Sequence, residues 1–255
     1  MMPKVSVVTV NLNNCTGLEK TIQSVVSQTY KCIEYIVVDG ASIDGSVDVI
    51  RYYNSHISKW ISENDKGVYD AMNKGVDLVS GDWVIFMNSG DAFYNDRIVE
   101  SLFIKRFDER YSVVYGNVCL CFRRGNIIKD LTPIKAQMPP FCHQSMFVRT
   151  EAFKKKGFDL KYTICADYDF AFSLYKSGAE FFHVNLTIAN YDMTGISAQR
   201  LDLYYKEFST IEGNYSSLMM LKNIVKSRIR SVFPGLFDAL FFWILKFRNK
   251  KKEVC

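Results

Sequence analysis

The sequence predicts an α/β protein with a mostly parallel sheet, because strand-like and helix-like segments alternate along its first half. Three short apolar runs have the pattern of strands buried on both faces, and they lie at Val5–Val10, Tyr35–Val38 and Trp83–Met87. With 255 residues, 48% hydrophobic composition and only 5 Pro, the chain is long enough for a large folded domain and is not a disordered protein.

The segments between these strands have helical signals. Thr16 and Glu19 have the spacing of a capping box, which predicts a helix that opens there and continues to about residue 28. Asp44 is expected to begin a second helix that ends near Tyr53. A short strand at Trp60–Ser62 and a helix at Val68–Val79 complete this half. Such alternation is typical of a parallel sheet covered by helices.

The second half has a different organisation. Two alternating segments predict a hairpin or an added sheet edge, at Ser112–Arg123 and Asn126–Leu131. Later elements are expected as a strand at Gln144–Val148, a helix at Asp167–Lys176, a strand at Glu180–Val184 and helical residues from Gln199 to about Lys226. We therefore expect one α/β domain over residues 1–200 and a helical extension over residues 201–255.

The charge is concentrated at the C-terminal end. From residue 222 onward there are nine Lys or Arg and two Asp or Glu, so this segment carries +7 while the residues before it carry −2 of the total +5. The main body is therefore not expected to bind nucleic acid. The seven Cys form no CxxC pair and are expected to be free thiols in the reducing cytoplasm.

Acidic residues follow the predicted strands at several places, namely Asp39, Asp65, Asp91 and the pair Asp167 and Asp169. In open parallel sheets, ligands bind beyond the carboxyl ends of the strands. Several carboxylates at one edge repel each other unless a cation or a donor-rich ligand joins them. Hard oxygen ligands suit Mg²⁺ or Mn²⁺, often together with substrate phosphates.

Common nucleotide-binding and hydrolase motifs are absent. The turn after the first strand, Asn11–Asn14, has no GxGxxG, and neither GxxxxGK[ST] nor GxSxG occurs in the chain. The remaining interpretation is an acidic, metal-assisted site for a phosphate-bearing ligand.

Six segments in order resemble family-2 glycosyltransferases, which have the GT-A fold. These segments are VSVVTVNLNN, VVDGASIDGS, SENDKGVYDAMNKG, FMNSGD, FCHQSMFVRTEAF and CADYDFAFSLYKSGAE. They cover roughly residues 4–200. The resemblance implies a GT-A-like, Rossmann-type sheet flanked by helices.

The resemblance implies donor-binding roles at the ends of the first strands. Thr9 and Asn11 match the position where the family holds the nucleotide base. Asp39 matches an acid that contacts the base or ribose, and Asp44 matches the second acid of that loop, with helix capping as its alternative role. Asp65 matches a further donor-contacting acid.

Other residues match the part of the family's site that handles the diphosphate. Asp91 matches the last acid of the DxD-type motif, which implies that it binds a divalent cation, Mn²⁺ or Mg²⁺. Asn88 stands where the first acid is common, so a metal would have fewer charged ligands. Lys74 is placed to neutralise a phosphate or to be a solvated helix lysine. His143 and Gln144 are placed beside the acceptor or diphosphate, with a structural loop histidine as the alternative for His143.

Asp167 matches the family's catalytic base, although Ala166 stands where Glu is frequent. An inverting transfer needs one basic group to take the proton of the acceptor hydroxyl. A divalent cation can offset the charge of the departing diphosphate. Asp169 would face away from Asp167 on a helix. No QxxRW motif occurs, which favours transfer of one sugar per encounter.

The C-terminal segment has features of a membrane-surface helix. Val232–Phe247 is strongly apolar, is interrupted by Pro234 and Asp238, and lies between basic flanks. It is shorter than the roughly 20 apolar residues of a spanning helix. Its aromatic residues suit an interfacial helix on an anionic surface, at the inner face of the cell membrane. A helix docked on its own domain or on a second subunit is the alternative.

The resemblance implies inverting, metal-dependent, non-processive transfer of a sugar from a nucleotide-diphosphate donor to a saccharide or lipid-linked acceptor, in surface polysaccharide assembly. A sugar-1-phosphate nucleotidyltransferase is one alternative, but NLNNCTG lacks the Gly-rich basic loop that it needs. A binding subunit without catalysis is the other, left open by Asn88 and Ala166. The main interpretation requires Asp39, Asp91 and Asp167 to lie around one cleft.

Overall fold

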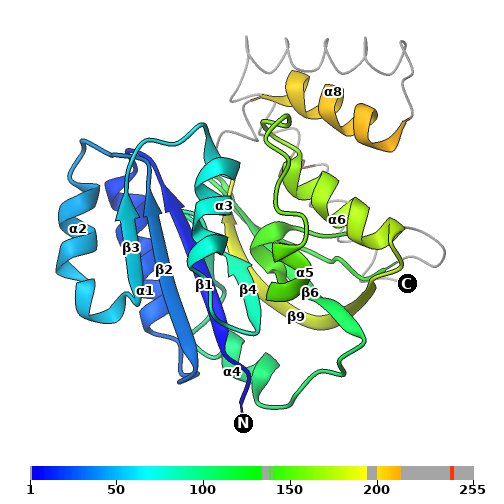
Figure 1. The fold of residues 1–255 in the computed structure, drawn as a ribbon, viewed down its shortest axis with the longest axis horizontal. Coiled ribbons are helices and arrows are strands. Elements are labelled where there is room, and N and C mark those ends of the chain that lie inside the picture. Colours follow the sequence, from blue (N-terminus) through cyan, green and yellow to red (C-terminus); the bar gives the residue numbers. More distant parts are fainter. Residues whose placement is uncertain (1, 134–137, 139, 194–199, 214–241, 244–255) are drawn as a thin grey trace.

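The computed structural model describes residues 2–133, 138, 140–193, 200–213 and 242–243. Within these residues, nine strands form a single mixed sheet in the order β3-β2-β1-β4-β8-β6-β9-β5, with β7 paired to β6. Helices cover the sheet on both sides (Figure 1).

The first half of the sheet is parallel, as predicted. It consists of β1 (Val5–Asn11), β2 (Ile33–Asp39), β3 (Lys59–Ser62) and β4 (Trp83–Phe86). β1 lies between β2 and β4, and every residue of β1 is buried, as expected for a strand covered on both faces. The register pairs Asn11 with Asp39, so both residues lie at the same carboxyl edge.

Helices pack closely against this parallel half. α1 (Cys15–Val26) and α2 (Ser46–Tyr52) contact each other, whereas α3 (Val68–Leu78) lies across β1 and β2 on the face turned toward the viewer in Figure 1. A Cβ at Gly75 of α3 would lie 2.4 Å from Val8 Cγ1. A side chain there would push α3 away from the sheet, and α3 carries one wall of the cavity described below.

The second half of the sheet is mixed. β6 (Tyr111–Phe122) pairs antiparallel with β7 (Gly125–Lys129) and β8 (Met146–Arg149), and parallel with β9 (Glu180–Asp192). The predicted hairpin is therefore confirmed. β9 extends eight residues beyond the predicted Glu180–Val184, because it follows β6 through register shifts and then pairs with β5 (Ala92–Phe93).

The remaining helices are short, apart from two. α4 (Ile98–Phe103), α5 (Thr150–Lys154) and the 3₁₀ turns η1 (Asn54–His56) and η2 (His143–Ser145) were not expected from the sequence. α6 (Ala166–Lys176) confirms the predicted helix, and α8 (Leu201–Glu212) lies inside the predicted helical stretch of residues 199–226. The division at residue 200 stays a prediction.

Two helix starts differ from the predictions. α1 begins after Asn14, whose Oδ1 accepts a hydrogen bond from Gly17 N at 3.1 Å, so the expected capping box of Thr16 and Glu19 is wrong. α2 begins at Ser46, after Gly45 in the left-handed region. The Asp44 carboxylate accepts hydrogen bonds from Ser46 N at 3.1 Å and from Cys15 N at 2.8 Å, and thereby braces both helix starts.

Most of the basic C-terminal segment lies outside the described residues. Of Val232–Phe247, only residues 242 and 243 are described. Phe242 is buried, and its ring meets that of Phe122 edge-on with centroids 5.7 Å apart. Among the helices that the structure describes, none is long and apolar enough to cross a membrane.

Glu34 forms a buried polar anchor at the amino-terminal end of the parallel strands. Its side chain is 3% exposed and accepts hydrogen bonds from Ser6 Oγ and Ser80 Oγ, both at 2.6 Å. Lys4 and Lys59 lie 3.4 and 3.6 Å from its carboxylate. Burial alone would raise the pKa of Glu34, but the bonds from Ser6 and Ser80 and the charge of Lys4 outweigh it and lower the pKa to about 2.

We predict that Glu34→Gln lowers the free energy of unfolding near pH 7 by roughly 3 kcal/mol, the free-energy equivalent of a carboxyl pKa lowered from 4.5 to about 2. A carboxyl with a lowered folded-state pKa stabilises the protein above its unfolded pKa of about 4.5, and this contribution is lost as the pH falls toward 2. Urea unfolding at a series of pH values measures it, with the exposed Glu19→Gln as control. A wild-type advantage of equal size near pH 7 and near pH 3 would contradict this account of Glu34.

Candidate active site

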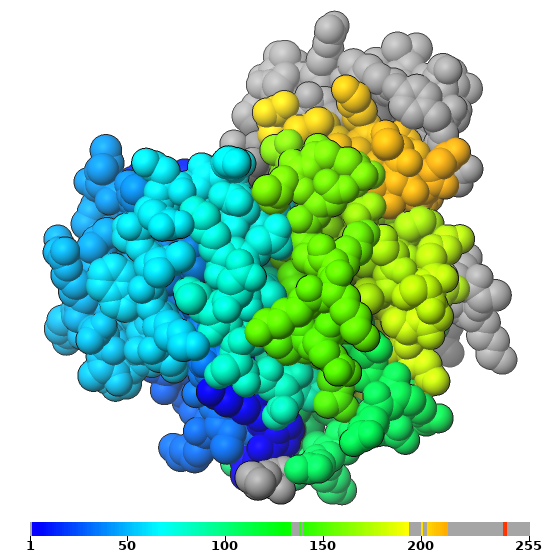
Figure 2. Space-filling model, in the orientation of Figure 1, coloured from blue at the N-terminus to red at the C-terminus, as the bar shows by residue number. Residues whose placement is uncertain are grey.

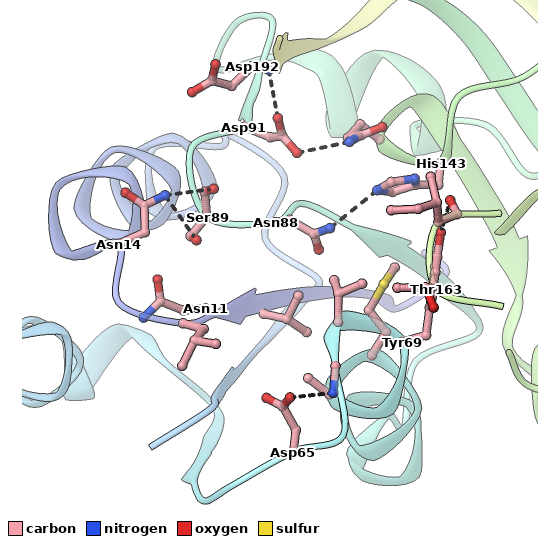
Figure 3. Close-up of a pocket in the computed structure, with 18 of the residues that line it drawn as sticks. Asn11, Asn14, Asp65, Tyr69, Asn88, Ser89, Asp91, His143, Thr163 and Asp192 are labelled. Atoms are coloured by element: carbon pink, nitrogen blue, oxygen red, sulfur yellow. Dashed lines mark hydrogen bonds between the residues drawn. The ribbon is translucent and has the colours of Figure 1, made fainter. Parts of the chain in front are cut away.

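A cavity of about 540 Å³ opens at the carboxyl ends of β1 and β4. It is walled by the turns after these strands, the start of α3, the η2 turn, the residues before α6 and the end of β9 (Figure 3). Its polar lining consists of Asn11, Asn14, Asp65, Tyr69, Asn88, Ser89, Asp91, His143, Gln144, Thr163, Tyr191 and Asp192. This is the edge at which ligands bind in open α/β sheets.

The turn Asn88–Asp91 is held in place by α1. Thr21 Oγ1 donates to Asp91 O at 2.6 Å, and Lys20 Nζ donates to Gly90 O at 2.6 Å. Asn14 Nδ2 donates to Ser89 O at 3.2 Å, so the cap of α1 also contacts the turn. Gly90 has φ +103°, a conformation that favours glycine. The turn therefore has a fixed shape before any ligand binds.

Asp91 is a buried carboxyl at one end of the cavity. Its Oδ1 accepts from Asp192 N at 2.9 Å, and its Oδ2 accepts from Gln144 Nε2 at 3.1 Å (Figure 3). Burial raises the pKa of Asp91 to about 6, although these hydrogen bonds and the charge of His143 oppose the rise. Asp91 therefore changes charge close to neutral pH.

Asp39 lies behind the cavity and orients Asn11. Asn11 Nδ2 donates to Asp39 Oδ1 at 2.8 Å, and Ser62 Oγ donates to Asp39 Oδ2 at 2.7 Å. Burial would raise the pKa of Asp39, but the bonds from Ser42, Ser62 and Asn11 lower it. Asn11 Oδ1 is buried and has no hydrogen-bond partner among the described residues. A ligand that carries an N–H or O–H donor would satisfy it.

Asp65 lies on the α3 side of the cavity. Its Oδ1 accepts from Gly67 N at 2.8 Å. Its Oδ2 packs on Gly40, where a Cβ would lie 2.5 Å away. Because Gly40 has no side chain, the Asp65 carboxylate can pack against the backbone that follows Asp39.

His143 and Asp167 form a directly bonded pair. His143 Nδ1 and Asp167 Oδ2 are 2.7 Å apart, and Asp167 Oδ1 accepts from Tyr69 OH at 3.0 Å and from Tyr168 N at 2.9 Å. Burial would raise the pKa of Asp167, but the bonds from His143 and Tyr69 lower it. His143 Nε2 lies 3.4 Å from Asn88 Nδ2, and Asn88 Oδ1 is buried without a partner among the described residues.

Six of the predicted site residues line the cavity, namely Asn11, Asp65, Asn88, Asp91, His143 and Gln144. Asp39 and Asp167 each lie behind a lining residue, joined to it by a hydrogen bond. Asp39, Asp91 and Asp167, the three acids expected around one cleft, therefore lie at the same cavity. Asp91 lines the cavity directly. Asp39 is joined to it by Asn11, and Asp167 by His143.

Three further predicted residues neither line this cavity nor make a hydrogen bond to a residue that lines it. Thr9 is buried and donates to Met87 O at 2.8 Å. Asp44 braces the starts of α1 and α2. Lys74 lies 2.7 Å from Glu63 on the outer side of α3. Their expected ligand contacts stay predictions.

Several lining residues were missed by sequence reasoning. Tyr69 follows Asp65 within the same motif, so its closeness to Asp65 in the sequence was an available signal. Asp192 was assigned no role, and the strand that carries it was expected to end at Val184. Thr163 precedes the Asp167 helix in a segment without regular structure.

The donor set fits a cation that is shared with a phosphate-bearing ligand. No group of three His, Cys, Asp or Glu that could hold a metal ion occurs among the described residues. Asp91 and Asp192 line the same cavity, and the negative charge of Asp192 contributes to the raised pKa of Asp91. One or two carboxylates plus phosphate oxygens are a usual set for Mg²⁺.

Two solved structures have a fold similar to that of this chain. The fold is similar to Staphylococcus aureus TarS residues 1–349 in complex with UDP, with a TM-score of 0.66, 15% identity, and coverage of 89% of this chain and 71% of that chain. It is also similar to the mannosyltransferase PcManGT from Pyrobaculum calidifontis in complex with GDP-Man and Mn²⁺, with a TM-score of 0.65, 15% identity, and coverage of 90% and 70%. The predicted GT-A fold is confirmed.

Residues 6–180 match Glycosyl transferase family 2, and the chain belongs to this family. It is 30% identical over 204 residues to a PGL/p-HBAD biosynthesis glycosyltransferase of Mycobacterium tuberculosis, covering 76% of this chain and 78% of that protein. It is 32% identical over 135 residues to the GalNAc(5)-diNAcBac-PP-undecaprenol beta-1,3-glucosyltransferase of Campylobacter jejuni, covering 51% and 43%. The protein is therefore a glycosyltransferase, which decides against the nucleotidyltransferase alternative.

α8 holds one wall of the cavity in place. The buried Glu207 carboxylate accepts from Thr163 N at 2.8 Å and from Ile164 N and Cys165 N, both at 2.9 Å. Thr163 and Ile164 line the cavity, and Cys165 precedes the helix that carries Asp167. Figure 2 shows the orange α8 in contact with the green residues of this segment.

We predict that Glu207→Ala lowers the free energy of unfolding by about 2–4 kcal/mol, because it leaves three buried N–H groups without their acceptor. The amides of residues 163–165 should also exchange faster with solvent. Denaturant unfolding and hydrogen exchange measure the two effects, with the exposed Glu109→Ala as control. Unchanged exchange at residues 163–165 would show that α8 does not hold this wall.

Proposed function

We propose that this glycosyltransferase transfers a sugar from a nucleotide-diphosphate donor to a hydroxyl of a saccharide or lipid-linked acceptor, with inversion and one sugar per encounter. The observation that carries the proposal is the cavity itself, in which two buried amide oxygens, Asn11 Oδ1 and Asn88 Oδ1, lack hydrogen-bond partners among the described residues. Nucleobase N–H groups and sugar hydroxyls are donors that would satisfy them.

The donor nucleotide would occupy the β1 side of the cavity. Asn11, oriented by Asp39, and Asp65 would contact the base and ribose, as the resemblance to the family implies. The cavity volume of about 540 Å³ lies in the range of small-molecule sites. The complexes of TarS with UDP and of PcManGT with GDP-Man support a nucleotide-linked donor.

Asp91 would hold a divalent cation, Mn²⁺ or Mg²⁺, together with the donor phosphates. Such a cation offsets the negative charge of a departing diphosphate. Asn88 stands where a carboxylate is common in this motif. The negative charge that the protein offers to the cation would therefore come mainly from Asp91 and Asp192. The Mn²⁺ complex of PcManGT supports this assignment.

Asp167, paired with His143, would supply the basic group that takes the proton of the acceptor hydroxyl. The pair lies beside Tyr69 and residues 163–165 of the cavity wall. His143 Nδ1 contacts the Asp167 carboxylate, and His143 Nε2 lies near Asn88 Nδ2. A base held by packing and hydrogen bonds needs little reorganisation during the reaction.

The acceptor would be a growing saccharide, either free or carried on a lipid diphosphate, in the assembly of a capsule, O-antigen or exopolysaccharide. The Campylobacter jejuni relative is named as a glucosyltransferase for an undecaprenol-linked saccharide, which supports a lipid-linked acceptor. The basic, aromatic C-terminal segment would bind the inner face of the cell membrane, where such an acceptor is presented.

We predict that one of UDP-, GDP-, CMP- or dTDP-sugars raises the melting temperature by about 5 °C or more when Mn²⁺ is present, because a bound donor stabilises the folded state. Asp91→Asn should remove the part of this rise that depends on Mn²⁺. Thermal unfolding measures both, with the exposed Asp96→Asn as control.

The Mn²⁺ dependence should weaken below the Asp91 pKa of about 6, because protonation removes the negative charge that binds the cation. An absence of any rise with all four donor classes would contradict the proposed donor. A rise that keeps its full Mn²⁺ dependence in Asp91→Asn would instead contradict the cation assignment alone.

We predict that the full chain floats with vesicles that contain an anionic phospholipid and that removal of residues 228–255 abolishes flotation. Basic residues near an anionic surface contribute about 1 kcal/mol each. A triple variant, Lys250→Ala, Lys251→Ala and Lys252→Ala, keeps the aromatic residues and should float less at physiological salt. Unchanged flotation of the truncated chain would exclude the C-terminal segment as the membrane contact.

A further inference from the structure

The hydroxyl of Tyr69 lies between two acceptors in the cavity wall, although it has a single proton to donate. Its oxygen is 2.7 Å from Ile164 O and 3.0 Å from Asp167 Oδ1. We propose that Tyr69 is a positioning residue for Asp167. Its hydroxyl donates to the ionised carboxylate, and it turns to Ile164 O once Asp167 has taken the proton of the acceptor hydroxyl. The inference rests on the proposed sugar transfer and adds the group that orients its base.

Tyr69 is held in a fixed place near the start of α3. It is 6% exposed, and its ring packs on that of Phe158 with centroids 5.2 Å apart. Figure 3 shows Tyr69 on the same side of the cavity as His143 and Thr163. Burial and the nearby charge of Asp167 raise the pKa of the Tyr69 hydroxyl well above its usual value, so it keeps its proton and remains a donor. Only the O–H bond has to rotate to change acceptor.

The second acceptor belongs to a peptide group that is held from both sides. Ile164 O and Cys165 N are the two polar atoms of this group. Glu207 Oε2 of α8 accepts from Cys165 N at 2.9 Å, and Tyr69 OH lies 2.7 Å from Ile164 O. Successive hydrogen bonds polarise one another, so the carboxylate at the N–H strengthens the carbonyl as an acceptor. A polarised carbonyl at the shorter distance therefore competes with the carboxylate of Asp167 at the longer one.

The charge of Asp167 decides between the two acceptors. Hydrogen bonds to an ionised carboxylate are roughly twice as strong as neutral ones, so the ionised form holds the Tyr69 proton. A protonated carboxyl has lost this advantage, and the shorter contact with Ile164 O becomes the stronger one. Asp167 Oδ1 also accepts from Tyr168 N at 2.9 Å, which keeps one donor on the carboxyl in both states.

Other titratable groups face Asp167 from several elements. Burial would raise its pKa, but the hydrogen bond and charge of His143, 2.7 Å from Oδ2, and the hydrogen bond from Tyr69 lower it. Three further groups interact with its charge, and burial raises the pKa of each, so that they are neutral near pH 7; they are Cys142, Cys165 and Tyr204. Tyr69 and His143 are thus the neighbours that favour the ionised carboxylate.

The transfer step balances with Asp167 as its base. The acceptor oxygen forms a bond to the anomeric carbon while its proton moves to the Asp167 carboxylate. The bond from the anomeric carbon to the diphosphate breaks, and its electron pair stays on the departing phosphate oxygen. The Tyr69 hydroxyl rotates toward Ile164 O and keeps its own proton throughout. Release of the proton from Asp167 to water restores the ionised carboxylate and its bond from Tyr69.

Tyr69→Phe removes the hydroxyl and keeps the packed ring. Tyr30→Phe is the matched control, because Tyr30 is 3% exposed and its hydroxyl donates to a backbone carbonyl, Pro3 O, just before β1. The assay measures nucleotide released from UDP-, GDP-, CMP- or dTDP-sugars with Mn²⁺, with a panel of p-nitrophenyl glycosides as acceptors.

We expect Tyr69→Phe to lower kcat by about tenfold, with the donor Kd within about threefold of wild type, because the carboxylate loses a donor that orients it for the reaction. Tyr30→Phe should keep both values. A kcat for Tyr69→Phe within twofold of wild type, on the order of experimental scatter, would overturn the positioning role.

A titration of the resting protein tests the pair without any turnover. The ¹³Cγ NMR signal of Asp167, identified as the one lost in Asp167→Asn, follows the ionisation of this carboxyl. We expect its midpoint to lie about one pH unit higher in Tyr69→Phe than in wild type or Tyr30→Phe, since the ionised form loses a hydrogen bond that the protonated form does not need.

An equal midpoint in Tyr69→Phe and wild type would show that the hydroxyl bonds to Ile164 O in both states, and it would overturn the inference. If the wild type turns over no donor while the midpoint moves as expected, the proposed function fails and the pairing of Tyr69 with Asp167 stands.

Discussion

The parallel pairing of β1 with both β2 and β4 is the constraint on which the rest of the site depends. It places Asn11 beside Asp39 and Val8 beside Phe86, so the chain leaves three neighbouring strands at one edge of the sheet. The polar residues that follow these strands are thereby gathered around one cavity. The strands are buried on both faces, and a shift of register would expose apolar side chains, so this arrangement is strongly specified.

Three chemically identical carboxyls acquire different properties from their surroundings. Asp39 and Asp167 receive several hydrogen bonds, which hold the pKa of each below its usual range despite burial. Asp91 is buried with fewer compensating bonds, and its pKa rises to about 6. The first two therefore act as permanent negative charges that orient Asn11 and His143, whereas Asp91 can gain or lose a proton near neutral pH.

Much of the fold could be predicted from the sequence, because β1, β2 and β4 are apolar runs and α3 and α6 have a helical period. The short β5, α4 and α5 were missed, since two to six residues carry little periodic signal. The second half of β9 was missed because it mixes polar and apolar residues, and Asp192 was missed with it. The order of the motifs identified six lining residues, but it could not reveal that Asp39 and Asp167 lie behind Asn11 and His143. Those contacts join segments that are 28 and 24 residues apart and depend on tertiary packing.

We place the nucleotide-sugar donor in the cavity at the carboxyl edge of β1 and β4. A crystal structure of the protein with Mn²⁺ and the donor that stabilises it tests this placement. We expect a nucleotide diphosphate in this cavity, with ligand donors at hydrogen-bond distance from Asn11 Oδ1 and Asn88 Oδ1 and the cation at Asp91. A donor bound on another surface, with this cavity filled only by water, would contradict it.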